Sequence, residues 1–255
     1  MSASLAGAAV LEQRLGAEGT AVVPYLTGGF PTIEVFQQSL EAISEDSIAV
    51  EIGIPFSDPM ADGATIQESS RVALERGATL DAIITAIEGL APLSADLIIM
   101  SYLNPLLAYG PETLMPRLGA IGVAALVVPD LPHEESSDLS RFAGESGIGL
   151  VQLVSPITGR DRLAILGAAS EGFTYAVTMT GTTGGSASVG NEVIEYLNGV
   201  RTASRPPVLA GFGVRTADQV RALGAHCDGV IVGSALVEVL AAGGDPVSFI
   251  AGLRQ

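Results

Sequence analysis

Eight short apolar segments of strand length recur along the chain at fairly even intervals, and this repeat limits the possible folds more than any other feature. The segments cover residues 21–27, 48–54, 96–100, 124–128, 149–154, 173–178, 207–210 and 229–232. The stretches between them carry apolar residues at helical spacing, for example Ile33, Phe36, Leu40 and Ile43. A strand followed by a helix, repeated eight times, predicts an α/β fold of the (β/α)8 TIM barrel type, in which parallel strands close into a barrel.

A doubly wound open sheet is the competing α/β fold, but it needs fewer repeats and usually has a glycine fingerprint after its first strand. The glycine clusters of this chain come late instead. A chain of 255 residues that is 48% hydrophobic can bury the core of one barrel, and no linker or charge run divides it. We therefore expect a single (β/α)8-barrel domain over residues 1–255, with an extra amphipathic helix within residues 1–16.

Threonines mark the expected starts of three helices, because a threonine hydroxyl can accept a hydrogen bond from the first turn of a helix. Thr65, Thr79 and Thr216 each precede a segment with helical spacing. The second of these helices follows the first with no strand between them. The helix over residues 111–119 should be cut short, since Pro116 lacks the N–H group that a helix interior needs.

The charge of the chain excludes several classes of partner. The formal net charge is −16 and the pI is about 4.3, which argues against nucleic acid or an anionic membrane, because both bind clusters of Lys and Arg. The first residues lack the positive flank and long apolar run of a secretory signal. No stretch reaches the roughly 18 uninterrupted apolar residues of a membrane span. We therefore expect a soluble enzyme of the cytoplasm.

All 12 basic residues are arginines, so the chain contains no lysine. This excludes a Schiff base to a carbonyl substrate and a pyridoxal phosphate held covalently by this chain. The single cysteine, Cys227, is expected to be a buried residue, and its neighbour His226 is too close in sequence for a helical metal site. His133 is expected to have a solvated or capping role at a helix start. We predict neither a metal site nor a cofactor.

Two carboxylates bracket the loop after the second apolar segment. Glu51 alternates with Val50 and Ile52, so its side chain should point into the barrel interior near the carboxyl end of a strand, where barrel active sites lie. Asp62 follows in a loop punctuated by prolines and glycine. A buried structural glutamate and a turn aspartate are the alternatives when each residue is taken alone. Together they favour an acid and base pair.

Glycine-bearing turns follow the last three apolar segments, at residues 181–185, 211–213 and 233–235. Backbone amides at such turns and at helix N-termini can bind a phosphate without lysine. Barrels commonly bind phosphate after strands seven and eight. The three turns together predict a phosphate site.

The segment VEIGIPFSDPMADGATIQ at residues 50–67 resembles the most distinctive segment of the α subunits of tryptophan synthase. Further matches follow in order over essentially the whole chain: VPYLTGGFP at 23–31, SYLNPLLAYG at 101–110, VVPDLPHEE at 127–135, SPITGRDRL at 155–163, FTYAV at 173–177, GFGVRTADQV at 211–220 and IVGSALV at 231–237. The resemblance implies a carbon–carbon lyase of tryptophan biosynthesis that cleaves indole-3-glycerol phosphate to indole and glyceraldehyde 3-phosphate.

The resemblance also implies roles for individual residues. Glu51 moves protons to and from the substrate, and Asp62 interacts with the indole N–H. Tyr175 lies close to the site. Tyr102 and Thr183 line it or order its loops. The remaining substrate-binding residues implied in this way, most of them phosphate contacts, are Tyr25, Gly184, Phe212, Gly213, Gly233 and Ser234.

The absence of lysine supports the same reaction, independently of the family resemblance. An aldol-type cleavage needs an electron sink, and the chain offers neither lysine nor a cluster of metal ligands. The substrate must then supply the sink. An indole does so once C3 is protonated, and two placed carboxylates are enough to control that proton.

The family's partner is a β subunit that holds pyridoxal phosphate and consumes the indole in an α2β2 complex. Asp58 and Pro59 lie in the loop that meets it, and both are retained. The chain departs from the family at Met179, where an arginine is common, and at Thr182, where a small aliphatic residue is common. These departures bear on the coupling of this chain to the β subunit more than on the cleavage of indole-3-glycerol phosphate.

Two other functions stay open from the sequence alone. The altered loop at residues 179–190 is compatible with a lyase that works without a partner and releases free indole for specialised metabolism. A barrel that binds sugar phosphates or a partner subunit without catalysis is the third possibility. The retention of Glu51 and Asp62 argues against it.

Overall fold

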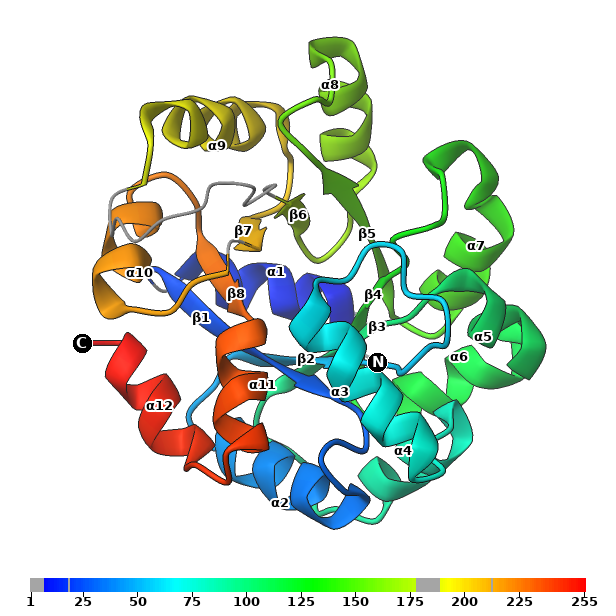
Figure 1. The fold of residues 1–255 in the computed structure, drawn as a ribbon. Helices are drawn as coiled ribbons and strands as arrows, with labels where there is room; N and C mark the ends of the chain where they lie inside the picture. Colours follow the sequence, from blue (N-terminus) through cyan, green and yellow to red (C-terminus); the bar gives the residue numbers. More distant parts are fainter. Residues whose placement is uncertain (1–6, 18, 178–188, 212) are drawn as a thin grey trace.

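The strands of the computed structural model, which describes residues 7–17, 19–177, 189–211 and 213–255, pair in parallel in sequence order and close into a barrel (Figure 1). Their bounds agree with the apolar segments to within a residue or two. They are β1 Ala21–Thr27, β2 Ala49–Gly53, β3 Asp96–Met100, β4 Val123–Val127, β5 Gly149–Val154, β6 Thr174–Val177, β7 Val208–Gly211 and β8 Gly229–Val232. The predicted (β/α)8 barrel is confirmed.

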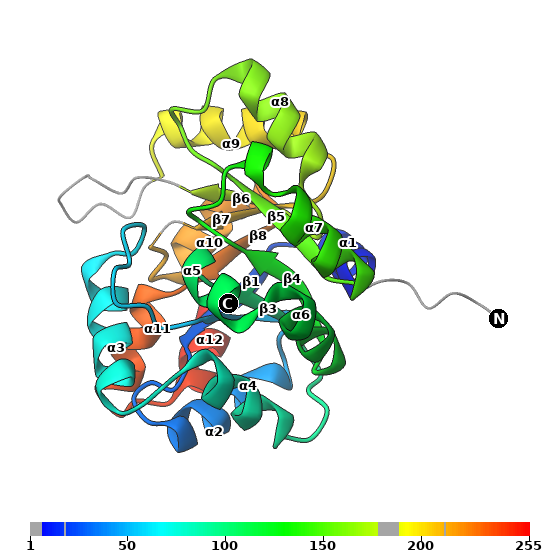
Figure 2. The ribbon, with the colours of Figure 1, turned by 90° about the vertical axis from the view of Figure 1, so that its right-hand side faces the viewer.

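The helices surround the barrel, as Figure 2 shows, apart from α1, which lies at one end. They are α1 Gly7–Ala17, α2 Ile33–Ser44, α3 Ala64–Glu75, α4 Leu80–Glu88, α5 Leu103–Tyr109, α6 Pro111–Ala120, α7 Ser137–Glu145, α8 Arg160–Ala169, α9 Asn191–Ala203, α10 Ala217–Gly224, α11 Ser234–Ala241 and α12 Pro246–Leu253. A short 3-10 helix, η1, covers His133–Glu135. In the described part of the chain, no helix is both long enough and apolar enough to cross a membrane.

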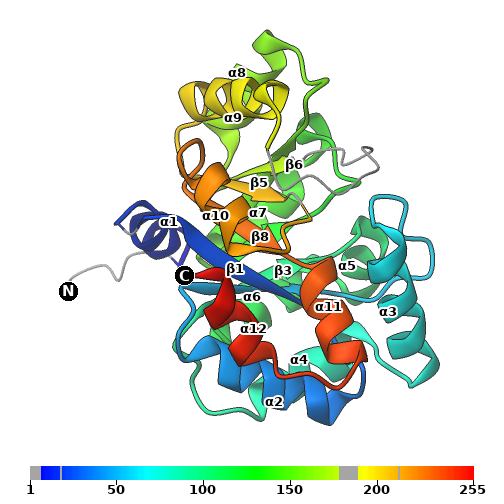
Figure 3. The same ribbon diagram turned by 60° about the vertical axis from the view of Figure 1, so that its left-hand side comes forward.

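The extra helix expected near the N-terminus is α1, and it covers the amino end of the barrel. The Ala8 amide donates to the carbonyl of Gly147 just before β5, at 3.1 Å, and Leu11 and Leu15 are completely buried. Figure 3 shows α1 at one end of the barrel and α3 at the other. The end where the strands finish is therefore left for a site.

Two of the three threonine caps are confirmed. The hydroxyl of Thr79 accepts from the Ala82 amide at 3.1 Å, and Thr216 forms a full capping box with Gln219. The third is wrong, because α3 begins at Ala64, two residues earlier than a Thr65 cap requires, and Gly63 is its N-cap. The Gly63 carbonyl accepts the first helical hydrogen bond, from the Gln67 amide at 3.0 Å, which places Thr65 inside the first turn.

The expectation that Pro116 shortens its helix is also wrong, since α6 continues to Ala120. Leu114, Met115 and Leu118 of α6 are completely buried. An interior proline costs a helix about 3 kcal/mol, whereas burying a large apolar side chain contributes roughly 1.5–3 kcal/mol. Three buried side chains outweigh one proline, so tertiary packing decides the length of this helix.

Candidate active site at the carboxyl end of the barrel

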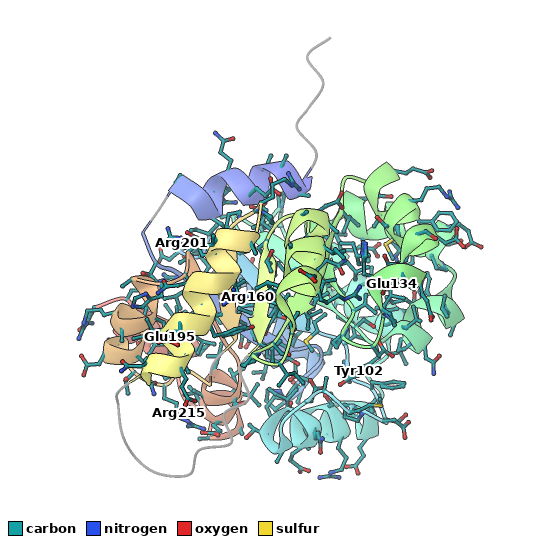
Figure 4. All side chains as sticks on the ribbon, turned by 90° about the horizontal axis from the view of Figure 1, so that it is seen from above. Tyr102, Glu134, Arg160, Glu195, Arg201 and Arg215 are labelled. Carbon is teal, nitrogen blue, oxygen red and sulfur yellow. The ribbon has the colours of Figure 1, made fainter. Side chains whose placement is uncertain are left out.

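A pocket of about 220 Å³ opens at the carboxyl ends of the strands, where (β/α)8 barrels carry their active sites. Figure 4 shows Tyr102 and Arg215 at the end of the molecule opposite α1. The lining residues come from the last positions of the strands and from the loops that follow them. They are Tyr25, Ala61, Asp62, Gly63, Ile66, Met100, Pro129, Leu153, Tyr175, Val177, Gly211, Gly213, Ile231, Gly233 and Ser234.

Glu51 lies on β2, where its Cα pairs in register with Tyr25 of β1 and Ile98 of β3. Its side chain is completely buried, as the strand alternation predicted, and neither carboxylate oxygen has a hydrogen-bond partner among the residues that the structure describes. Burial, and then the nearby charge of Asp62, raises the pKa of Glu51 to about 8. Glu51 is therefore protonated at neutral pH and can donate a proton.

Asp62 lines the pocket from the loop between β2 and α3. Burial raises the pKa of its carboxyl to about 6, and a hydrogen bond from the Tyr102 hydroxyl acts in the opposite direction. At neutral pH most of the Asp62 population is ionised. Glu51 is buried and is not among the residues that line the pocket, but it lies close enough to Asp62 for the two charges to interact. A protonated carboxyl group therefore lies near a carboxylate on the pocket wall, which is the arrangement that acid–base chemistry needs.

The loop that carries Asp62 is held on several sides. The Tyr102 hydroxyl accepts from the Ala61 amide at 2.9 Å, and the Tyr102 ring stacks on Phe56 with 5.0 Å between ring centroids. The Gln67 side-chain amide donates to the Asp62 carbonyl, also at 2.9 Å. These contacts fix the backbone on both sides of Asp62. Tyr102 orders this loop and is not among the residues that line the pocket.

Tyr25 and Tyr175 lie across the barrel mouth because two strands end in glycine. A Cβ atom at Gly53 would stand 1.9 Å from the Tyr25 hydroxyl oxygen, and one at Gly211 would stand 2.5 Å from a Tyr175 ring carbon. Burial is the main cause that raises the pKa of each tyrosine, so both keep their hydroxyl protons. Two aromatic rings beside Glu51 suit a flat apolar substrate.

Gly213, Gly233 and Ser234 line the pocket on the side of β7 and β8. Ser234 is the first residue of α11, whose N-terminus therefore opens toward the pocket. No lysine or arginine side chain is among the described lining residues. Backbone amides and the helix dipole are the positive groups that this side offers to a phosphate. Three residues predicted for this region, Thr183, Gly184 and Phe212, lie outside the described residues, as do Met179 and Thr182.

The two residues predicted to meet a partner lie outside the pocket. Asp58 is exposed and accepts a hydrogen bond from the Ser57 hydroxyl at 2.5 Å, and Pro59 is half-buried. Met60, next in the chain, is 82% exposed. This stretch of the β2–α3 loop therefore presents an apolar side chain to the outside while Asp62, two residues later, faces the pocket.

Several lining residues were not predicted from the sequence. Met100, Leu153 and Ile231 supply apolar walls at strand ends, and Ile66 supplies another from the first turn of α3. Strand alternation carried forward to the last inward-facing position could have found the first three. Nothing in the sequence could have shown that Phe56 stacks on Tyr102, because the two residues lie on different strand–loop units.

Cys227 is buried as expected, and burial raises the pKa of its thiol to about 12. His133 is in η1, and its Nδ1 atom is buried without a hydrogen-bond partner in the described region, which differs from the solvated or capping role expected for it. Within the described ranges no three His, Cys, Asp or Glu side chains gather as a group that could hold a metal ion.

Comparison with known proteins gives a consistent result. The family model described as "Tryptophan synthase alpha chain" matches residues 11–248. A tryptophan synthase alpha chain of Bacillus cereus is 40% identical over 222 residues, 86% of each chain, and one of Oceanobacillus iheyensis is 37% identical over 237 residues, 92% of this chain and 90% of the relative.

Solved structures agree with the sequence relatives. A chain of tryptophan synthase from M. tuberculosis superposes with a TM-score of 0.85 at 30% identity, covering 98% of this chain and 99% of that one. The tryptophan synthase subunit alpha of Legionella pneumophila superposes with a TM-score of 0.87 at 27% identity, covering 99% and 98%. The barrel therefore has counterparts of known structure over almost its whole length.

Proposed function

This chain belongs to the tryptophan synthase alpha chain family, and from that premise we propose that Glu51 and Asp62 are the acid and base with which it cleaves indole-3-glycerol phosphate. The reaction is a retro-aldol cleavage to indole and glyceraldehyde 3-phosphate in tryptophan biosynthesis. The single observation that carries the assignment is the pair of neighbouring carboxyl groups, Glu51 buried in the barrel with its pKa raised to about 8 and Asp62 on the pocket wall with its pKa raised to about 6. Their different protonation states give each a separate task.

The protonated Glu51 donates its proton to C3 of the indole ring, which leaves the ring nitrogen iminium-like. The Asp62 carboxylate accepts a hydrogen bond from the indole N–H and stabilises the positive charge there. Glu51, now ionised, takes the proton of the glycerol hydroxyl adjacent to the ring. A carbonyl forms at that carbon, the carbon–carbon bond breaks, and its electrons return to the indole. Glu51 ends protonated, ready for the next substrate.

The rest of the pocket holds the two ends of the substrate. The rings of Tyr25 and Tyr175, with apolar strand ends, suit the indole. The amides at Gly213, Gly233 and Ser234 suit the phosphate, which explains how an acidic chain without lysine can bind one. Thr183, Gly184 and Phe212 are included in this site on the resemblance alone. We take residues 1–255 as one barrel domain located in the cytoplasm.

The partner of this family is the β subunit of tryptophan synthase, which consumes the indole. We place the contact at Asp58 and Pro59, because they lie beside the exposed side chain of Met60, in the same loop as the pocket-lining residues Ala61 and Asp62. Product released from the pocket would then emerge next to the partner. The loop between β2 and α3 would connect the partner directly to Asp62.

The decisive experiment measures indole release by the purified chain with and without a tryptophan synthase β subunit. We expect slow release by the isolated chain and strong activation by the partner. High turnover without the partner would instead identify a lyase that works alone, and no indole under either condition would indicate a barrel without catalysis. A β subunit that leaves the rate unchanged would contradict the proposed contact.

A further inference from the structure

The carboxylate of Glu238 links three segments that lie next to pocket-lining residues: the first turn of α3, the loop between β7 and α10, and α11 itself. Both of its oxygens accept hydrogen bonds from the Arg215 guanidinium, each at 2.7 Å, and the Thr65 hydroxyl donates to one of them at 3.4 Å. Thr65 follows Asp62 by three residues, Arg215 follows Gly213 by two, and Glu238 follows Ser234 by one helical turn. The cluster of Thr65, Arg215 and Glu238 therefore connects the loop that carries Asp62 with the two turns proposed to bind phosphate, at Gly213 and at Gly233 and Ser234.

Each member of the cluster is fixed to a rigid element. Glu238 is on α11, which packs against α3 and β1. The Arg215 amide donates to the Gln219 side chain at 2.8 Å, so the backbone of Arg215 is held by the capping box at the start of α10. Figure 4 shows Arg215 at the pocket end of the barrel. A two-point ion pair between such elements restrains their relative position and not only the rotamers of the two side chains.

We propose that Glu238 is a positioning residue that holds the phosphate turns of β7 and β8 at a set distance from the loop carrying Asp62. The inference rests on the proposed function, because it matters only if one substrate spans both ends of the pocket. The phosphate would then fix one end of the molecule while Asp62 must meet the indole N–H at the other. A small misplacement of either end lowers the rate of the chemical step.

The arrangement also distinguishes this role from a direct one for Arg215. If Arg215 bound the phosphate itself, removing Glu238 would release the guanidinium from its ion pair. The affinity for a phosphate ligand would then stay the same or increase. If the ion pair only positions the loops, removing either partner should lower kcat by the same factor, and removing both should lower it little further. The side chains of Arg215 and Glu238 are 54% and 44% exposed, so we expect little change in overall stability from breaking the pair.

The test compares Glu238→Gln, Arg215→Met, the double variant and the charge exchange R215E/E238R in the full chain. Arg141→Met is the matched control, since it breaks an exposed pair with Glu145 on α7, which contributes no residue to the pocket. We expect kcat for indole release to fall about 3- to 10-fold in both single variants and no further in the double variant. The dissociation constant for glyceraldehyde 3-phosphate should change less than about twofold, and the charge exchange should recover much of kcat.

Wild-type kcat and KM in Glu238→Gln would overturn the inference. So would weaker glyceraldehyde 3-phosphate binding in Arg215→Met together with unchanged binding in Glu238→Gln, which would make Arg215 a phosphate ligand. A fall in kcat in Arg141→Met as large as in Glu238→Gln and Arg215→Met would show a general effect of surface charge. That result would also overturn the inference. Failure of the proposed function is a separate outcome, because the unmodified chain would then release no indole.

Discussion

Glu51 and Asp62 are both carboxyl groups, yet their surroundings give them different protonation states at neutral pH. Glu51 is completely buried without a partner in the described region, whereas Asp62 receives a hydrogen bond from Tyr102 and lies at the pocket wall. Burial disfavours the charged form, and the hydrogen bond favours it. At the scale of single residues, the local environment separates the acid from the base.

The substitution Glu51→Gln should remove the proton donor while keeping the shape of the side chain. We expect indole release to fall by at least about 100-fold, as is usual for loss of a general acid. Binding of glyceraldehyde 3-phosphate, measured by calorimetry, should stay close to that of the unmodified chain. Turnover similar to the unmodified chain would contradict the role of Glu51.

The same substitution should change stability in a pH-dependent way. Because the pKa of Glu51 is raised to about 8 in the folded chain, the unfolded chain ionises this group first as the pH rises. The contribution of Glu51 to stability is therefore fully present below its unfolded pKa and is lost as the pH approaches 8. The Tm of Glu51→Gln relative to the unmodified chain should be higher at pH 8 than at pH 5. An equal difference at both pH values would argue against the raised pKa.

A third prediction concerns Tyr102→Phe. The plot of kcat/KM against pH should be bell-shaped, with an acid limb near 6 from Asp62 and an alkaline limb near 8 from Glu51. Loss of the Tyr102 hydroxyl removes the hydrogen bond that lowers the pKa of Asp62, so the acid limb should move to higher pH. Tyr109→Phe is the control, because its hydroxyl bonds Asp81 and Arg117 away from the pocket. An unmoved acid limb in Tyr102→Phe would exclude this influence.

At the scale of elements, packing and capping compete to set where each helix begins and ends. Thr79 and Thr216 cap their helices as their local sequences predict, while Thr65 does not, because Gly63 already satisfies the first turn of α3. In α6, three buried side chains carry the helix through Pro116. Local signals hold where no larger packing energy opposes them.

The substitution Pro116→Ala should therefore stabilise the chain. Pro116 is exposed in the middle of α6, so alanine restores an N–H group and introduces no clash. We expect the free energy of unfolding in urea to rise by about 1–3 kcal/mol. Pro111→Ala is the matched control at the first position of the same helix, where proline is well tolerated, and it should not stabilise. A loss of stability in Pro116→Ala would show that proline stiffens the unfolded chain more than it strains the helix.

At the scale of the whole molecule, the two ends of the barrel have different tasks. The amino end is covered by α1, whose Leu11 and Leu15 are completely buried, and the carboxyl end carries the pocket. In (β/α)8 barrels, residues at the amino end of the strands generally serve stability, and residues at the carboxyl end serve the chemistry. Changes at the amino end should therefore affect stability without affecting the site.

The substitution Leu15→Ala tests this separation. Removing a completely buried leucine should lower the free energy of unfolding by about 2–5 kcal/mol, measured by urea denaturation. The kcat of the fraction that remains folded at 25 °C should stay within about twofold of the unmodified chain, because the pocket lies at the opposite end. A large fall in kcat with unchanged secondary structure would show that the two ends are coupled.

Periodicity along the chain was sufficient to predict the barrel, its strand bounds and the inward direction of Glu51, because the alternation of a strand and the repeat of a helix are local properties. The family resemblance, carried by the segment at residues 50–67, added the substrate. Only the tertiary structure decided the length of α6, the cap of α3, the stacking of Phe56 on Tyr102 and the joining of Thr65, Arg215 and Glu238. These features depend on contacts between residues far apart in sequence. Their energies come from packing, burial and charge proximity, none of which a local pattern specifies.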